Sequence, residues 1–347
     1  MTRYRAALAT IAVLIVAAVL FTVVRDPTPP ATASSTGGEV LPVSQRLGAP
    51  DFTGIDGWLN TTPLTLADLR GKVVLIDFWT FSCVNCVRTI PHLKVLYDAY
   101  KSRGLVIVGV HSPEFDFEKV PANVTAAVKR LGIPWPVAID SQMATWNAYQ
   151  NQYWPAEYLL DQQGRVAYTS FGEGDYPQTD AAVAELLNVH TAPLPSSTPV
   201  PANTTPELYA GSLRGQLADG EAYGTLGAPQ RYPDPGPPQQ QDAIQVTGTW
   251  IDEGQYLQAD GTAQVRLNFV ADTAYIVAGT PGAVLPVSVK LDGKTVPADT
   301  SGSALTASAF MVTRQDLFQL LSGVSPGYHL IDLTVPAGFR IYTFTFG

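Results

Sequence analysis

Val73-Val-Leu-Ile-Asp-Phe-Trp-Thr-Phe-Ser-Cys-Val-Asn-Cys-Val-Arg-Thr-Ile-Pro91 sets an apolar run directly ahead of two closely spaced cysteines. The run Val73–Trp79 is short and rich in β-branched residues, which predicts a buried strand. From Val84 to Tyr100 apolar residues recur at helical spacing, and Gly104 supplies a stop signal. Pro91 lies inside this predicted helix and should kink it. The cysteine pair is therefore expected where a strand gives way to a helix.

The elements that follow continue this alternation. The periodicity predicts strands at Leu105–Val110 and Pro136–Asp140, helices at Val120–Leu131 and Met143–Gln150, a hairpin of Glu157–Asp161 with Arg165–Phe171, and a closing helix at Ala181–Val189. Strands that alternate with helices and end in a hairpin indicate an α/β or α+β layer fold, with helices on both faces of a central sheet. We assign this unit to residues 46–190.

The C-terminal part has a different pattern. A proline-rich segment, residues 191–206, predicts a linker to a second domain at 207–347. Asp292-Gly293 suits a hairpin turn, and Asp316–Leu321 is expected to be a short helix. The strands are predicted at Ile244–Trp250, Gln264–Val270, Tyr275–Gly279, Val287–Leu291, His329–Val335 and Phe339–Phe346. Short strands separated by turns indicate an all-β sandwich or jelly roll.

The N-terminal end carries a targeting signal. Arginines precede the apolar stretch Ala6–Val24, which is long enough to span a membrane. We expect an uncleaved anchor at residues 1–25 and a Pro/Ser/Thr tether at 26–45. The alternative is a signal peptide that is cleaved near Ala33. In both cases the rest of the chain is exported and extracytoplasmic.

Composition excludes two classes of protein. A net charge of -9 without a Lys/Arg cluster argues against a nucleic-acid partner, which needs a basic surface to neutralise phosphates. Two cysteines are too few for a disulfide-stapled scaffold. A different reason is needed for the pair.

Cys83 and Cys86 suit thiol–disulfide chemistry. At a helix N-terminus, the helix dipole and unpaired N–H groups should lower the pKa of the Cys83 thiol and make it the nucleophile. Arg88, one turn on, favours the same shift, and the motif itself contains no acidic neighbour. Cys86, one turn inside, should then resolve the mixed disulfide with a partner protein.

Other uses of a cysteine pair require further residues. A zinc site needs two further ligands, and no second cysteine pair or H-x3-5-H pair is present. Haem attachment needs His where Val87 stands. We therefore expect no metal and no cofactor other than the redox-active Cys83–Cys86 disulfide. A static structural disulfide stays open as an alternative, and a thiol peroxidase is a third option.

Asp77 and Pro155 are further candidates for the site. Asp77 interrupts an apolar run, so it is either a buried carboxylate that relays a proton to Cys86 or a solvated residue at a strand edge. Trp154-Pro155 precedes a strand, where proline is tolerated and a cis peptide bond can occur. A cis form allows the adjoining backbone to face the cysteines and pair with a substrate segment.

The quoted stretch resembles the active site of thioredoxins. On this resemblance Asp77 corresponds to the buried acid of the family, Trp79 to its strand-end tryptophan, and Pro91 to its helix-kinking proline. Cys83 and Cys86 correspond to the redox pair, and Trp154-Pro155 to the cis-proline. The dipeptide Val84-Asn85 differs from the Gly-Pro of cytoplasmic thioredoxins, which leaves the redox poise open.

A narrower resemblance covers residues 46–347. The cysteine motif, His111-Ser-Pro-Glu-Phe-Asp-Phe-Glu118, Tyr153-Trp-Pro155 and Phe171-Gly-Glu-Gly174 are similar to the exported half of DipZ-type, TlpA-like proteins. This implies a thioredoxin-like domain followed by a β-sandwich that resembles a carbohydrate-binding module. DipZ-type proteins also carry a multi-helix membrane domain, whereas this chain has one apolar segment. A reductase of this kind needs a separate membrane electron donor.

These observations predict an extracytoplasmic thiol–disulfide oxidoreductase that acts on exported protein disulfides, more readily as a reductase than as an oxidant. The alternative is a cell-envelope protein that binds a ligand or carbohydrate and carries a static disulfide. Some aromatic residues of the second domain are candidate platforms for cell-wall saccharides, although aromatic residues of β-domains are more often buried. They are Trp250, Tyr256, Tyr275, Tyr328 and Tyr342.

Overall fold

The computed structural model describes residues 39–190 and 203–347, all of which belong to one compact unit. The predicted anchor, the tether up to residue 38 and residues 191–202 of the predicted linker lie outside these ranges. Within the ranges, no helix has the length and apolar character needed to cross a membrane. Thr205, near the end of the predicted linker, is buried and donates a 2.6 Å hydrogen bond to Asp242.

The first sheet carries the cysteine motif. Its six strands follow the order β1 (Gly57–Leu59), β4 (Val137–Ile139), β3 (Leu105–His111), β2 (Val73–Trp79), β5 (Ala156–Leu160) and β6 (Val166–Phe171). β2, β3 and β4 are parallel, whereas β1, β5 and β6 pair antiparallel with their neighbours. Every residue of β2 is buried, as expected for a central strand covered on both faces.

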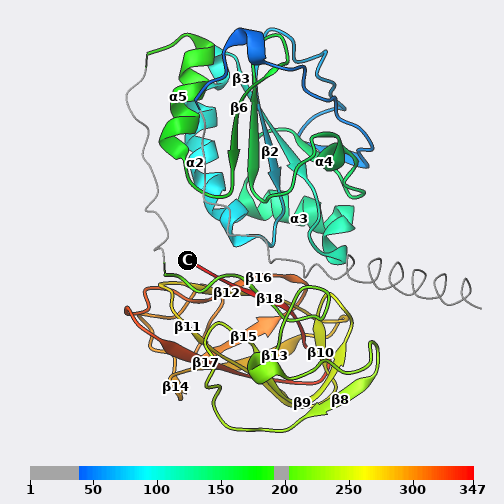
Figure 1. Ribbon diagram of the computed structural model, residues 1–347, viewed down its shortest axis with the longest axis vertical. Helices are drawn as coiled ribbons and strands as arrows, with labels where there is room; N and C mark the ends of the chain where they lie inside the picture. The colour runs from blue at the N-terminus through cyan, green and yellow to red at the C-terminus, as the bar shows by residue number, and fades with distance from the viewer. Residues whose placement is uncertain (1–38, 191–202) are drawn as a thin grey trace, which may run out of the picture. The chain divides into compact units, whose positions relative to one another are not determined.

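Helices cover the two faces of this sheet unequally. The helices are α2 (Val84–Tyr100), α3 (Pro121–Leu131), α4 (Ala144–Ala148) and α5 (Tyr176–Leu187), with short 3-10 turns η1 (Val43–Gln45), η2 (Lys101–Arg103) and η3 (Asp116–Lys119). α2, α3 and α5 share one apolar core with the sheet, and α4 packs on the opposite face. Figure 1 shows α2 and α5 side by side on one side of the strands and α4 on the other.

Most predicted elements of this part are confirmed, including β2 and α2 with their stated bounds. The closing helix differs, because α5 begins at Tyr176 rather than Ala181. Pro177 lies in its first turn, where a missing N–H costs nothing, so the helix extends upstream of the apolar periodicity. β1 was not predicted.

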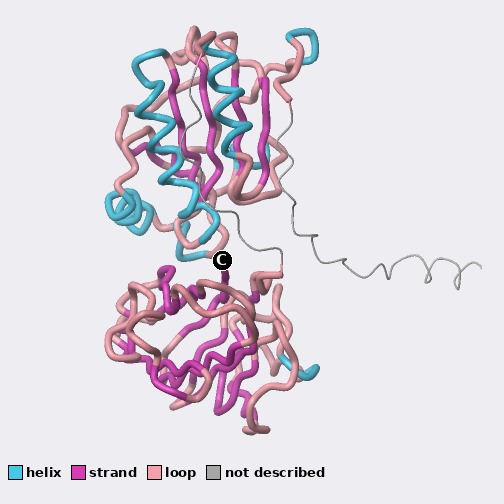
Figure 2. The backbone as a smooth tube through the Cα atoms, turned by 90° about the vertical axis from the view of Figure 1, so that its left-hand side faces the viewer, coloured by secondary structure: helices cyan, strands magenta, loops and turns pink. Residues whose placement is uncertain are grey.

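The regular elements of the second part are almost all strands, joined by long loops (Figure 2). Its elements are β7 (Leu208–Tyr209), η4 (Ala218–Gly220), β8 (Pro229–Tyr232), β9 (Gln245–Asp252), β10 (Leu257–Ala259), β11 (Ala263–Phe269), β12 (Ala274–Gly279), β13 (Leu285–Leu291), β14 (Lys294–Thr295), β15 (Ala309–Val312), β16 (Asp316–Leu321), β17 (His329–Val335) and β18 (Arg340–Phe346). The main strand order is β14-β13-β17-β11-β9-β10-β18-β12-β16. Val287 and Leu333 from one end of this order share a core with Ile276 and Phe344 from the other, so the sheet curls into a sandwich.

The predicted helix at Asp316–Leu321 is wrong, because this segment is strand β16. It pairs antiparallel with β12, with Phe318 opposite Ile276, and it buries Leu320 and Leu321. Pairing with a distant strand overrides the local preference for helix. The Asp292-Gly293 turn is confirmed, with positive φ at both residues as a tight hairpin requires. The predicted fold class, an α/β layer domain followed by an all-β sandwich, is also confirmed.

Candidate active site

The two thiols lie at the junction of β2 and α2. Cys83 is the N-cap residue of α2, and its Sγ accepts a hydrogen bond of 3.2 Å from the backbone N–H of Cys86. Both cysteines are free thiols. Cys83 is half-buried, whereas Cys86 is only 1% exposed. A partner can therefore reach Cys83 first, with Cys86 one turn behind it.

The surroundings of Cys83 oppose ionisation. Burial raises the pKa of the Cys83 thiol above its usual value, and the carboxylates of Glu114 and Glu207 act in the same direction. The hydrogen bond from Cys86 offsets only part of this effect. The predicted lowering of the Cys83 pKa is therefore wrong in this conformation, because desolvation and acidic groups distant in sequence outweigh the helix terminus. Burial raises the pKa of Cys86 further still.

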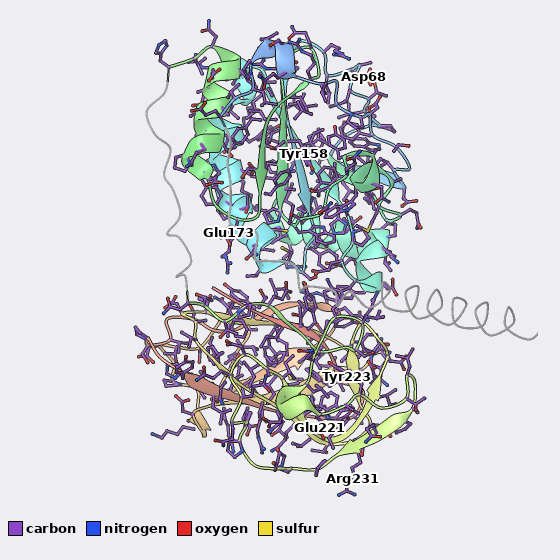
Figure 3. The ribbon with its side chains drawn as sticks, viewed as in Figure 1. Asp68, Tyr158, Glu173, Glu221, Tyr223 and Arg231 are labelled. Atoms are coloured by element: carbon purple, nitrogen blue, oxygen red, sulfur yellow. The ribbon has the colours of Figure 1, made fainter. Side chains whose placement is uncertain are left out.

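Arg88 does not act as a free cation beside Cys83. Its Nε lies 3.0 Å from each carboxylate oxygen of Glu173, and its second amino group lies 2.7 Å from Oε2. Glu173, labelled in Figure 3, follows β6 in the loop before α5. The same guanidinium donates a 2.7 Å hydrogen bond to the side chain of Asn85. Glu173 thus neutralises the charge that the sequence placed near the nucleophile.

Asp77 is a buried carboxyl, 3% exposed in the middle of β2. Its residue parity places it on the same face of the sheet as Leu75 and Trp79, which is the face that α2 and α5 cover. Burial raises its pKa well above the usual range, and the nearby Glu157 adds to this shift. The alternative of a solvated strand-edge residue is excluded.

Glu118 is a positioning residue that the sequence did not single out. It is fully buried and accepts a hydrogen bond of 2.6 Å from the hydroxyl of Ser82, the residue before Cys83. Its other oxygen accepts from the backbone N–H groups of Glu114 and Phe115, at 2.7 and 3.0 Å. Glu118 therefore ties the cysteine loop to the segment after β3. The one signal in the sequence was its place in the segment His111–Glu118, which is similar to a segment of DipZ-type proteins.

Trp79 and His111 are buried side chains that pack behind the cysteine loop. Their rings meet edge to face with centroids 5.2 Å apart. His111 Nε2 lies 3.2 Å from the hydroxyl of Thr80. Burial lowers the pKa of His111 to about 3, so the imidazole is neutral at physiological pH. The pair fills space beneath the cysteine loop and carries no charge.

The Trp154–Pro155 peptide bond is cis, as the resemblance implied. The indole of Trp154 stacks on Trp146 with centroids 4.1 Å apart and donates a 2.9 Å hydrogen bond to the carbonyl of Ser112. Cys83 and Trp154 pack against the same apolar cluster. The structure therefore places Trp79, Cys83, Cys86 and Trp154 in or against one apolar cluster, and Asp77 acts electrostatically on Cys86.

Residues of the C-terminal part also reach the segment after β3. The hydroxyl of Tyr209 lies 2.8 Å from Glu114 and 3.0 Å from Glu207. Arg214 donates a 2.9 Å hydrogen bond to Glu114, and its guanidinium lies 3.7 Å from the centre of the Tyr209 ring. These contacts supply acidic neighbours of Cys83 that its own motif lacks.

The aromatic residues proposed as saccharide platforms in the second domain differ in how deeply they are buried. Trp250 is completely buried and Tyr342 is 3% exposed, so both belong to the apolar cores. Tyr256 packs against Tyr342 with the two rings tilted by 43° and their centroids 4.9 Å apart. Tyr275 is half-buried, and Tyr328 is 62% exposed. The five side chains do not form one shared face.

Two family descriptions match the chain. Residues 43–187 match the family described as Redoxin, and residues 205–347 match the family described as Thioredoxin like C-terminal domain. Together the matches cover the two sheets and the whole candidate site.

Among curated relatives, the protein DipZ of Mycobacterium bovis is 41% identical over 315 residues, which cover 86% of this chain and 43% of DipZ. The chain thus spans less than half the length of that relative. The thiol-disulfide oxidoreductase YkuV of Bacillus subtilis is 30% identical over 41% of this chain and 95% of its own length. The thiol-disulfide oxidoreductase ResA of Bacillus thuringiensis is 30% identical over 40% of this chain and 76% of its own length.

Proposed function

Because the chain belongs to the TlpA/DipZ-like family of thioredoxin-like proteins, we propose that it is an extracytoplasmic thiol–disulfide oxidoreductase that uses Cys83 and Cys86. The observation that carries this proposal is the arrangement of the two thiols at the start of α2. The more accessible Cys83 accepts a hydrogen bond from the backbone of Cys86, whose own thiol is buried one turn on. This order of access suits a nucleophile and a resolving thiol.

The reaction on a protein disulfide has two steps. The Cys83 thiolate attacks one sulfur of the substrate disulfide, forms a mixed disulfide and releases the first substrate thiolate. Cys86, as a thiolate, then attacks Sγ of Cys83 and releases the second. Because burial raises the pKa of Cys83, only a small fraction of the enzyme carries the thiolate at neutral pH. The bonds to sulfur that form and break in this reaction involve only these two thiols and the substrate disulfide.

Substitution of each cysteine tests the proposal. Cys83→Ser is expected to abolish reduction of protein disulfides, because the one thiol that remains, Cys86, is only 1% exposed and is out of reach of a substrate disulfide. Cys86→Ser should instead accumulate a mixed disulfide at Cys83, which mass spectrometry detects as the mass of the attached substrate. Full disulfide-reducing activity in the Cys83→Ser protein would contradict the proposal.

The protein could either reduce the disulfides of its substrates or form them. We assign the protein to the reductases, with exported protein disulfides as substrates, and with a membrane protein supplying electrons to an enzyme held at the membrane by residues 1–25. The reduction potential of the pair tests this. A value near that of thioredoxin, about -270 mV, supports a reductase, and one near about -120 mV indicates an oxidant.

The competing function is a cell-envelope binding protein in which the two cysteines form a static disulfide. It predicts that the oxidised protein exchanges with dithiols too slowly to measure and that Cys86→Ser traps no partner. The half-buried position of Cys83 favours exchange, because a static disulfide gains nothing from an accessible sulfur.

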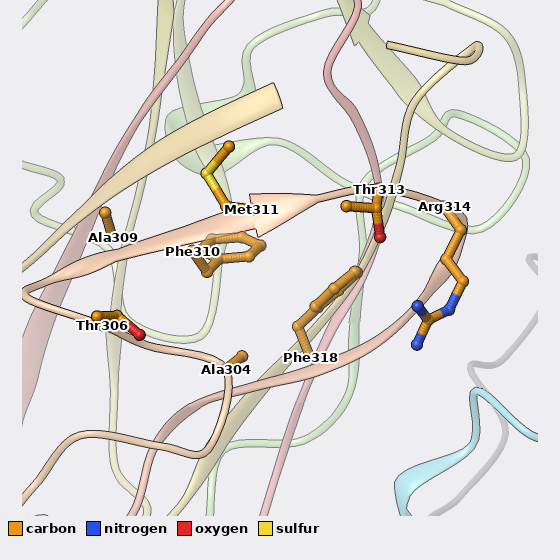
Figure 4. A pocket seen from close by; sticks show the side chains of 8 residues that line it. All are labelled: Ala304, Thr306, Ala309, Phe310, Met311, Thr313, Arg314 and Phe318. Atoms are coloured by element: carbon orange, nitrogen blue, oxygen red, sulfur yellow. The ribbon is translucent and has the colours of Figure 1, made fainter. Parts of the chain in front are cut away.

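For the second domain, the open pocket shown in Figure 4 supports saccharide binding. Its volume is about 370 Å³, and Phe310 and Phe318 give it an aromatic wall with centroids 5.4 Å apart. Thr306, Thr313 and Arg314 add polar groups, the combination that sugar rings need. Calorimetric titration with cell-wall saccharides tests this role. Binding that Phe318→Ala abolishes supports it, and the absence of heat with the wild-type protein rules it out.

A further inference from the structure

A second carboxyl lies beside Asp77. In the antiparallel pair of β2 with β5, Glu157 is the residue directly opposite Asp77. Opposite residues project to the same face with their Cβ atoms about 5 Å apart, so the two carboxyls are neighbours. Glu157 is 5% exposed, and Oδ1 of Asp77 has no hydrogen-bond partner in the described ranges. Two carboxyls at this spacing, away from water, cannot both be ionised without a large cost.

A line of polar groups continues from Glu157 between α2 and α5. The hydroxyl of Thr179 donates a 3.0 Å hydrogen bond to Oε2 of Glu157. Asp180 follows Thr179 on α5, and its Oδ1 lies 3.1 Å from Nε2 of His92 on α2, without the alignment of a hydrogen bond. Both His92 and Asp180 act electrostatically on Glu157. The Asp180 side chain retains 12% exposure, whereas that of His92 retains 3%. Asp180 is therefore where this line meets solvent.

We infer that Asp77 and Glu157 share one proton and that Glu157, with the His92–Asp180 pair, conducts the proton of Cys86 between the buried site and solvent. The inference rests on the proposed thiol–disulfide exchange and adds positioning and proton-carrying residues to it. Cys86 is 1% exposed and cannot lose its proton directly to water. Asp77, which acts electrostatically on Cys86, is the first acceptor in the line.

The Cys86 S–H bond breaks, its proton passes to the singly protonated Asp77–Glu157 pair, and a proton leaves this pair from Glu157 to Asp180 and water. The Cys86 thiolate then attacks Sγ of Cys83, the new S–S bond forms, and the bond from Cys83 to the substrate breaks. The leaving substrate thiolate takes a proton from solvent. The enzyme dithiol is thereby oxidised by two electrons, and the substrate disulfide is reduced to two thiols.

The charges around Glu157 fit a proton carrier that works near neutrality. Burial raises its pKa to about 7, with Asp180 and Asp175 adding to the shift. The hydrogen bond from Thr179 and the positive field of His92 oppose that rise. On the β6 side, the Tyr168 hydroxyl lies 3.3 Å from that of Thr179. A group with such a pKa takes up and releases protons with little free-energy cost at pH 7.

The first experiment separates the two thiol steps. Reduced full-length protein is mixed with excess dipyridyl disulfide in a stopped-flow instrument. Attack by Cys83 releases thiopyridone at a rate that depends on reagent concentration, and attack by Cys86 releases a second equivalent at a rate that does not. In Glu157→Gln, the concentration-independent phase should slow by about tenfold near pH 7, below the 10²–10⁴-fold of a directly acting acid or base.

The pH profile distinguishes proton transfer from a structural effect. The wild-type concentration-independent phase should show an inflection near pH 7, which Glu157→Gln removes. Glu185→Gln, an exposed change on α5, is the matched control and should leave both phases unchanged. Glu157→Gln with the wild-type rate and profile overturns the inference, and so does equal slowing of both phases at every pH.

A second variant tests the exit to solvent. In Asp180→Asn, the concentration-independent phase should slow and should recover as imidazole buffer is added, because a small buffer replaces a missing surface carrier. Slowing without recovery assigns Asp180 a structural role and overturns the exit route. If the wild-type protein shows neither phase, the proposed function itself fails. If the wild-type protein shows both phases and the variants behave like it, the inferred proton route from Cys86 to Asp180 is wrong, whereas the proposed function stands.

Discussion

At the scale of single residues, the reactivity of Cys83 is governed by neighbours that its own motif does not contain. Burial and the carboxylates of Glu114 and Glu207 raise its pKa, while Arg88 is neutralised by Glu173. The helix N-terminus supplies one favourable hydrogen bond from Cys86 and no more. The C-x-x-C spacing therefore identifies the chemistry, but the rate at neutral pH depends on the surrounding charges.

Glu173→Gln tests this balance. The change removes a negative charge beside Arg88 while keeping the shape of the side chain, so the guanidinium becomes an uncompensated cation near Cys83. The pKa of Cys83 should fall, as measured by the pH dependence of alkylation with iodoacetamide. Glu221→Gln, on the second domain, serves as a charge-matched control. An unchanged alkylation profile in Glu173→Gln would show that the Arg88–Glu173 ion pair does not influence the pKa of the Cys83 thiol.

At the scale of elements, the segment after β3 holds the cysteine loop in place through Glu118. Four hydrogen-bond donors converge on this carboxyl: the hydroxyl and N–H of Ser82 and the N–H groups of Glu114 and Phe115. In Glu118→Ala these buried donors lose their acceptor, at a cost of about 1–3 kcal/mol for each group left unsatisfied.

The measurable consequence is a loss of stability. Glu118→Ala should lower the free energy of unfolding, measured by urea denaturation, by roughly 3 kcal/mol. This is a large destabilisation for a single substitution. Asp116→Ala in the same turn, η3, removes an exposed carboxylate and should cost no more than about 0.5 kcal/mol. Equal effects of the two variants would mean that the buried hydrogen bonds of Glu118 do not hold the loop.

Elements defined by local patterns were predictable from the sequence. The apolar run of β2 and the helical spacing of α2 fixed the position of Cys83 and Cys86, and the turn residues of Asp292-Gly293 fixed a hairpin. Features set by pairing between distant segments were not. The helical preference of Asp316–Leu321 was overridden by β12, and the approach of Glu157 to Asp77 depends on the register of β5 against β2. No local periodicity carries that information.

At the scale of the whole molecule, the apolar cluster behind the cysteines is not confined to the first sheet. Val277 and Tyr342, from strands β12 and β18, belong to the same cluster as Trp79, Cys86 and the α2 side chains. Both family matches are therefore parts of one folded unit, and the redox site should respond to the stability of the whole unit.

Buried carboxyls also make that stability depend on pH. The pKa of Glu157 is about 7 in the folded protein and about 4.3 in an unfolded chain, so the folded state binds more protons between these values. Stability from this group is complete below about pH 4 and is lost as the pH rises through 7. At 1.36 kcal/mol for each pKa unit, the loss is roughly 4 kcal/mol by pH 8.

Glu157→Gln removes this loss, because an amide does not ionise. The variant should gain up to about 4 kcal/mol in free energy of unfolding over the wild type at pH 8, relative to the difference between the two proteins at pH 4. Urea denaturation at both pH values measures the gain, with Glu185→Gln as the exposed control. Asp77 titrates in the same buried pair, so part of the pH dependence should persist in Glu157→Gln and disappear in the double variant with Asp77→Asn. If the difference between Glu157→Gln and the wild type is the same at pH 4 and pH 8, Glu157 does not hold a proton in the folded state, and the proton line from Cys86 to Asp180 loses its central carrier.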